Sequence, residues 1–332
     1  MSLESGDSQT TFSRLKAAWG RALCESFQGY GNWKSAWLEN GQVLEFARYK
    51  KRNPQRLRMA DLQDNLKGLV YSMKPALEKL LPEGMKLPTP QVDVIQGSTH
   101  REDKFFMDLP ATLEMFDPLY QEFMNGHGAI AQSKSSANAW LKKEQEFLCH
   151  LLATLLVSGG VSPRTHLAQT CQIRGIQRNI FYISGSLVWI SSLSKTNSAT
   201  QSSGGLWAFP PQVTWPICYY LGVVRPFSIH LLKSMNNEFD SDVLNNYLFV
   251  YTSTSNHTQR LWTSKNAQQV IETSFANPLG LKMDCYDLRQ ILQAVANQHF
   301  VGSNGNALIY LIVNEILLTY FTQSMNFSFL KN

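Results

Sequence analysis

The residues of this sequence whose types and spacing suggest a chemical role are its cations. The stretch RYKKRNPQRLR, residues 48–58, holds six basic residues in eleven positions around Pro54. A further cation, Arg164, follows an apolar stretch that ends at Gly159-Gly160, and its neighbours offer it no carboxylate. Arginine can bind phosphate with two parallel hydrogen bonds, so both features are candidates to hold an anion. The alternatives are a solvated loop or nuclear-import patch for the basic run, and a bond to a helix-terminal carbonyl for Arg164.

Other kinds of chemistry have no motif in this chain. The five cysteines are scattered without a CxxC pair, which indicates neither a zinc ribbon nor a redox dithiol. The histidines are dispersed and no HExxH motif is present. P-loop, GxGxxG and GxSxG signatures are also missing. We therefore expect no metal and no cofactor, and we find no motif for a hydrolase, kinase or dehydrogenase.

Composition and charge limit the partners that can be expected. The chain of 332 residues is 44% hydrophobic, so it can bury large cores, and its net charge of +5 permits an anionic partner without requiring one. Residues 1–11 predict a loose polar tail, and the lack of a secretory segment there predicts an intracellular location. The most apolar segment, 307–321, is shorter than the roughly 20 residues of a membrane span. We expect no membrane contact there, but a buried helix or one that joins copies in a homo-oligomer.

The spacing of apolar residues predicts a mainly α protein with a small β-hairpin. A long helix is expected over 137–157, capped by one of the serines in 133–136. The stretch NIFYISGSLVWISSLSK, residues 179–195, predicts a hairpin that ends in Lys195. Further helices are expected over most of 12–83, and over 211–232, 264–276 and 284–298.

Two interpretations concern the helix expected over 211–232. The aromatic residues of 207–220 are expected to pack in the core rather than to stack on bases. Arg225, which precedes Pro226, is expected to cap the end of its own helix.

Six short motifs follow one another between residues 136 and 300. They are LLVSGGVSPRTHL, QRNIFYISGSLVWISSLSK, YYLGVVRPF, YLFVYTS, LWTSKNAQQVIE and YDLRQILQAV. In this order and spacing they resemble the fungal recombinase-like region found upstream of RecQ-type and telomere-linked helicases, which is related to the Crypton class of tyrosine recombinases. The resemblance implies a helical N-terminal domain followed by a tyrosine-recombinase-like catalytic-type domain.

The resemblance also implies roles for single residues. In tyrosine recombinases a tyrosine attacks a DNA phosphodiester, two arginines hold the phosphate, and a hairpin lysine protonates the leaving oxygen. Arg164 and Arg289 stand in the place of the two arginines, and Lys195 stands in that of the lysine. Tyr286 occupies a position where recombinases often carry histidine. Arginines placed in advance would stabilise the charge on the phosphate oxygens.

Three departures from the family pattern concern catalysis. The first arginine box has His166 where relatives often carry an acidic residue, and Gln290 follows Arg289 where relatives usually show histidine. The late HSxxTAxxxY-like motif, which supplies the attacking tyrosine, is missing. Tyr310 and Tyr320 lie among aliphatic residues at helical spacing and are expected to be packed aromatics. Because the covalent route needs a nucleophile, strand transfer is not expected and the four matched residues are vestigial.

We therefore predict a non-catalytic, transposon-derived remnant that binds duplex DNA, which would give it a nuclear location. It would comprise a helical region over 12–135, the recombinase-like domain over 136–300, and a divergent apolar helix over 301–332. The alternatives are an active strand transferase using Tyr310 or Tyr320, and an accessory protein without a DNA role, encoded in a fungal secondary-metabolite gene cluster or a subtelomeric region. The residues predicted to contact nucleic acid are Arg48, Lys50, Lys51, Arg52, Arg164, Arg174, Arg178, Lys195 and Arg289.

Overall fold

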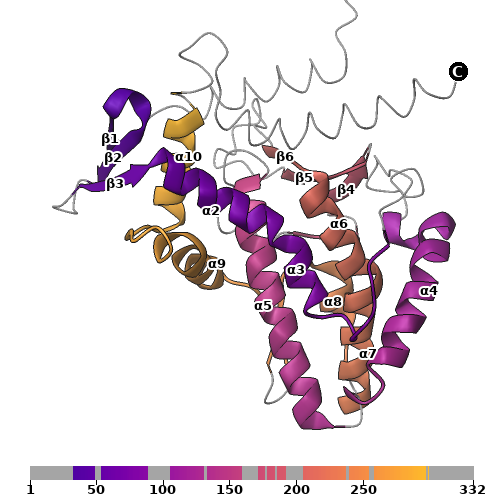
Figure 1. Ribbon diagram of the computed structural model, residues 1–332. Helices are drawn as coiled ribbons and strands as arrows, with labels where there is room; N and C mark the ends of the chain where they lie inside the picture. The colour runs from indigo at the N-terminus through magenta and orange to yellow at the C-terminus, as the bar shows by residue number, and fades with distance from the viewer. Residues whose placement is uncertain are drawn as a thin grey trace, which may run out of the picture.

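The described part of the chain is mainly helical with small antiparallel sheets, which confirms the predicted fold class at the level of secondary structure (Figure 1). The computed structural model describes residues 33–48, 54–88, 105–130, 133–158, 171–175, 178–183, 185–191, 205–236, 239–253, 258–296 and 298.

An antiparallel sheet opens the described chain, where the sequence predicts helix. Its strands, in the order β1-β2-β3, are β1 (Trp33–Leu38), β2 (Val43–Arg48) and β3 (Gln55–Arg58). The helical prediction is wrong for this stretch, because its burial alternates. Leu44 and Phe46 are buried, whereas Glu45 between them reaches the surface, and this period of two belongs to a strand. Trp33 stacks on Phe46 across the sheet, with ring centroids 5.8 Å apart.

Five helical segments follow. The first two lie within the region 12–83 that was predicted to be mostly helical, and the longest one was also predicted. They are α2 (Met59–Tyr71), α3 (Met73–Glu78), the short 3₁₀ turn η2 (Phe106–Asp108), α4 (Pro110–Gly126) and α5 (Lys134–Ser158). Helix α5 confirms the expectation for 137–157. Its cap also lies within the predicted serines, since the Ser136 amide donates to Ser133 Oγ at 3.4 Å.

The predicted hairpin is confirmed, and the structure adds a third strand to it. The second sheet, in the order β4-β5-β6, consists of β4 (Ile180–Ile183), β5 (Ser186–Ser191) and β6 (Gly205–Phe209). The predicted helix over 211–232 is confirmed as α6 (Pro211–Tyr219), the π-helical turn η5 (Tyr220–Val224) and α7 (Arg225–Met235). Thr214 ties the sheet to α6, because its hydroxyl donates to the carbonyl of Phe209 and accepts the amide of Leu187.

The last described elements are short and surround one more small sheet. They are α8 (Asp242–Asn246), the paired strands β7 (Val250–Thr252) and β8 (Gln259–Leu261), α9 (Ser264–Ile271), the π-helical turn η6 (Glu272–Ala276) and α10 (Cys285–Ala296). The helices predicted over 264–276 and 284–298 are thereby confirmed.

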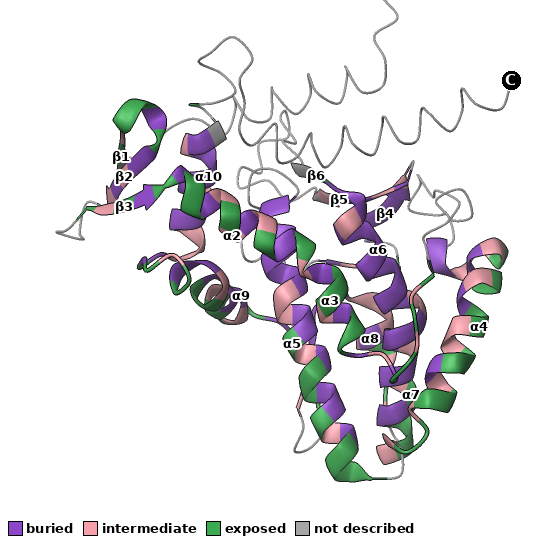
Figure 2. Cartoon of the chain, in the orientation of Figure 1, coloured by how far each residue is buried: buried purple, intermediate pink, exposed green. Residues whose placement is uncertain are grey.

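Helix α5 organises the hydrophobic core. Its C-terminal half is buried almost all round, and it contacts α2, α3, α6, α7 and α9 (Figure 2). The buried residues form one cluster that extends from Leu44 on β2 to Val295 on α10. This cluster crosses the predicted domain boundary at residues 135 and 136, and the division itself stays a prediction. The aromatic residues Trp215, Tyr219 and Tyr220 are buried within it, as expected.

Among the helices of the described ranges, none is both long and apolar enough to cross a bilayer.

Candidate nucleic-acid interface

Several predicted site residues fall outside the described part of the chain. They are Lys50, Lys51, Arg52, Arg164, Lys195, Tyr310 and Tyr320, together with the segment 307–321 that was predicted to join copies of the chain. Arg48 ends strand β2, but its side chain is not among those described. The convergence of Arg164, Lys195 and Arg289 on one phosphate therefore stays a prediction.

The basic run of 48–58 belongs to a β-hairpin and not to a loop between helices. Strand β2 ends at Arg48, β3 begins at Gln55, and the two strands pair antiparallel, with Phe46 opposite Gln55. Residues 49–53, which hold three of the six cations, therefore join two paired strands. One interpretation of the basic run was a solvated loop between helices. That interpretation is wrong, because paired strands and not helices flank residues 49–53.

Strand β3 turns two cations to solvent. Its side chains alternate, with Leu57 buried and both Arg56 and Arg58 exposed. The Arg56 side chain is 70% exposed, and its Nε donates to Oε2 of Glu45 on the neighbouring strand at 2.8 Å. This side of the hairpin therefore presents positive charge, one unit of which is matched by Glu45.

A side-chain clamp joins the base of this hairpin to the segment before α10. Gln55 Nε2 donates to the carbonyl of Lys282 at 2.8 Å, and the amide of Lys282 donates to Gln55 Oε1 at 2.5 Å. A second link runs from Asn65 Nδ2 on α2 to the carbonyl of Ser274, at 3.2 Å. Residues more than 200 positions apart are thus held together, and Figure 1 shows the β1–β3 sheet, α9 and α10 at the same end of the molecule.

The beginning of α10 is capped by two aspartates. Asp284 Oδ1 accepts the amides of Tyr286 and Asp287, at 2.9 and 3.0 Å, while Asp287 Oδ2 accepts the amide of Asp284 at 3.1 Å. This reciprocal cap fixes the first turn of the helix. Tyr286 and Arg289 lie on that turn and the next and are half-buried. Arg289, one of the predicted site residues, therefore lies on α10, the helix that follows the segment clamped to the basic hairpin.

Two other predicted arginines contact their own protein. Arg174 pairs with Asp108 Oδ1 and lies 5.1 Å from the centroid of the Phe105 ring. Arg178 is only 2% exposed and lies over the Phe181 ring at 5.0 Å. Arg178 therefore cannot reach a DNA phosphate from this position, whereas Arg174 would have to exchange its carboxylate for one.

A buried polar cluster links α5 to the π-helical turn and α7. Glu144 Oε1 accepts the hydroxyl of Tyr220 at 2.8 Å and that of Ser228 at 2.6 Å. Arg225 Nε in turn donates to the Tyr220 hydroxyl at 2.9 Å. Burial raises the pKa of the Glu144 carboxyl, and the positive charge of Arg225 opposes part of that rise. These four side chains are buried, so the cluster serves packing and has no access to a substrate.

Arg225 caps a different helix from the one predicted. Its guanidinium donates to three carbonyls at the end of α8, those of Leu244, Tyr247 and Leu248, at 2.6–3.2 Å. Its own helix does not end there. The helical axis continues through the π-helical turn, in which the Arg225 amide bonds to the carbonyl of Tyr220. A local motif of arginine before proline could not indicate this distant partner.

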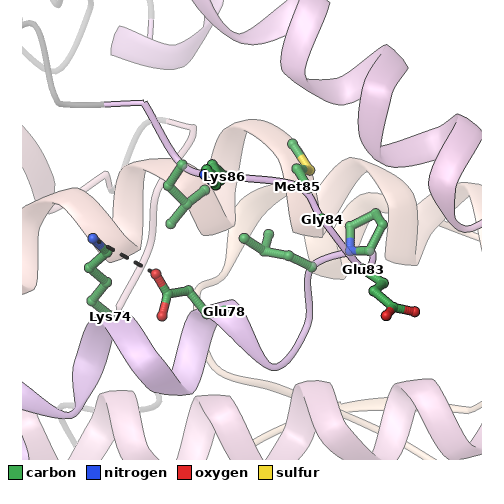
Figure 3. Close-up of a pocket in the computed structure, with 9 residues that line it drawn as sticks. Lys74, Glu78, Glu83, Gly84, Met85 and Lys86 are labelled. Carbon is green, nitrogen blue, oxygen red and sulfur yellow. Dashed lines mark ion pairs between the residues drawn. The ribbon is translucent and has the colours of Figure 1, made fainter.

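A surface hollow of about 530 Å³ lies beside the loop that follows α3 (Figure 3). Lys74, Glu78, Glu83 and Lys86 contribute charges of both signs to it, and Lys74 Nζ lies 3.8 Å from Glu78 Oε1. The mixed charges do not converge on one ligand group. The ranges that the structure describes also contain no group of three His, Cys, Asp or Glu side chains that could hold a metal ion.

No protein-family model matches the chain, and neither the curated proteins nor the solved structures include a match. The resemblance to tyrosine recombinases therefore stays a prediction that rests on the sequence motifs alone.

The distribution of acidic residues is a signal that sequence reasoning missed. Residues 147–237 contain six basic residues and no Asp or Glu, so this stretch alone carries more positive charge than the whole chain. The structure uses part of that charge internally, since Arg178 and Arg225 are buried and Arg174 pairs with Asp108 from outside the stretch. Among the described cations, those exposed on β3 are therefore the better candidates to bind an anionic partner.

Proposed function

We propose that this chain binds duplex DNA, without catalysis, through the basic hairpin of β2 and β3. The observation that carries the proposal is the clamp between Gln55 and Lys282, which holds the hairpin on the segment before α10. A hairpin on a defined support can present its charges in one orientation.

The chemistry of the hairpin suits a phosphate backbone. Arg56 and Arg58 lie two positions apart on the exposed side of β3, and three further cations lie between the strands in the sequence. Contacts from lysine and arginine to phosphates supply most of the sequence-independent affinity for DNA.

The recombinase-like origin offers a second set of contacts. Arg164, Lys195 and Arg289 would hold a phosphate if the resemblance is correct, and a nuclear location would follow from a DNA partner. The active strand transferase is the less favoured alternative, because the late motif of the family that supplies the attacking tyrosine is missing from the sequence.

The test is a fluorescence-anisotropy titration of labelled duplex DNA at several salt concentrations. Arg56→Gln/Arg58→Gln should weaken binding and flatten the slope of log K against log salt by about 0.9 to 1.8, since each lost phosphate contact accounts for about 0.9 and Arg56 is shared with Glu45. The matched control is Lys134→Gln/Lys142→Gln, which removes the same charge from exposed positions of α5 and should leave the slope nearly unchanged.

Three outcomes separate the alternatives. Loss in the hairpin variant alone supports the proposal. Weaker DNA binding in Arg164→Ala/Arg289→Ala, together with unchanged binding in the hairpin variant, would assign the site to the recombinase-like clamp instead. Absence of salt-dependent binding by the wild type would refute a DNA role and favour the accessory protein.

A further inference from the structure

We propose that Glu45 competes with DNA phosphate for Arg56 and thereby lowers the affinity and the salt dependence of the hairpin. This inference rests on the proposed DNA-binding function. It assigns to an acidic residue inside a basic surface the role of a built-in restraint.

The geometry places the two groups in direct competition with a phosphate. Glu45 and Arg56 are cross-strand partners in the register of β2 and β3. Their ion pair uses Nε of the guanidinium, at 2.8 Å, and the Glu45 side chain is 28% exposed. The arginine is thus held at the surface by a carboxylate that occupies one of its hydrogen-bonding positions. A phosphate that approaches Arg56 meets the negative charge of Glu45 beside it.

The sequence around the pair makes this carboxylate unusual. With Asp61 it is one of the two acidic residues that flank the basic run, it bonds a cation of that run, and residues 46–60 between the two contain six cations and no Asp or Glu. Fold stability alone gives little reason for the pair, because exposed ion pairs contribute little to stability. The ion pair matters more for the binding of an anion than for the stability of the fold. Removal of Glu45 both frees one cation and removes one repulsive charge.

The experiment compares Glu45→Gln with the wild type in the same anisotropy titration. The glutamine keeps the size and the hydrogen-bonding oxygen of the side chain but removes the charge. We expect binding to tighten by about two- to fivefold, the range that corresponds to a surface ion pair. The slope of log K against log salt should steepen by about 0.9, because Arg56 gains a phosphate. In an Arg56→Gln background the same substitution should have a much smaller effect.

Glu122→Gln is the matched control, because Glu122 is an exposed carboxylate on α4, a helix that carries none of the cations predicted to contact nucleic acid. It changes the net charge by the same amount without touching the hairpin. An equal gain in this variant, or a gain from Glu45→Gln that persists without Arg56, would show an effect of net charge and overturn the inference. Unchanged binding in Glu45→Gln, with the hairpin variant still weakened, would overturn it while leaving the proposed function intact. No binding by any variant would overturn both.

Discussion

The buried cluster around Glu144 allows a stability prediction that separates charge from hydrogen bonding. Glu144→Ala removes the acceptor of the Tyr220 and Ser228 hydroxyls. Ser228 keeps the carbonyl of Val224 at 3.0 Å, but the Tyr220 hydroxyl loses the acceptor to which it donates. A buried donor without a partner costs about 1–3 kcal/mol. Arg225 is also left without a nearby carboxylate, and loss of one partner from a buried charge network costs about 3–5 kcal/mol.

Because these costs overlap, we expect Glu144→Ala to lower the free energy of unfolding by about 3–5 kcal/mol. Glu144→Gln should cost much less, since the amide oxygen still accepts both hydroxyls. The assay is urea unfolding followed by tryptophan fluorescence, since Trp140 lies one turn before Glu144 on α5.

The dependence on pH gives the same prediction a second test. Burial raises the pKa of Glu144 above its usual value, so the folded protein holds this proton more tightly than the unfolded chain does. The stabilisation from this shift is complete below the unfolded pKa of about 4.5 and is lost as the pH rises through the folded pKa. The wild type should therefore lose stability relative to Glu144→Gln over that range. Equal destabilisation by alanine and glutamine would refute the reasoning, because it would mean that the charge and not the acceptor holds the cluster.

Three further predictions concern packing, helix propensity and the hairpin clamp. Gly222→Ala should destabilise the fold by about 1–3 kcal/mol, because its new Cβ would lie 2.6 Å from the Phe116 ring. Gly68→Ala, where no atom lies within 4 Å of the new Cβ, should stabilise the protein by up to about 1 kcal/mol in the same urea-unfolding experiment. Gln55→Ala should speed hydrogen exchange at the Lys282 amide, which loses its acceptor, and an unchanged exchange rate would contradict the clamp.

The parts of the fold that could be predicted are those in which the local pattern and the final packing agree. The long helix over 137–157 and the hairpin over 179–195 have unambiguous periods, and both are present. The strands β1 to β3 could not be predicted in the same way. Val43, Leu44, Phe46 and Ala47 fit one turn of a helix as well as a strand. Their choice depends on pairing with β3 and on contacts to residues beyond position 270.

The candidate site shows the same division between local and distant information. The density of cations in 48–58 was visible in the sequence, but their arrangement on a hairpin was not. Arg178 was predicted to contact nucleic acid, and only the tertiary structure reveals that it is buried. Arg225 was assigned to its own helix because Pro226 suggested an end. A π-helical turn instead lets the helix continue past the proline, which frees the guanidinium for α8.

The cations that are already bonded inside the fold limit how steeply DNA binding can depend on the salt concentration. If all six cations of 48–58 met a phosphate, the slope of log K against log salt would be about −5.4, at about 0.9 per contact. Restraint of Arg56 by Glu45 reduces this to about −4.5. Three of the six basic residues of 147–237 add little to it, because Arg174, Arg178 and Arg225 are already bonded or buried. A slope much steeper than −5.4 would therefore require cations beyond the hairpin, and Arg164, Lys195 and Arg289 would be the first to test.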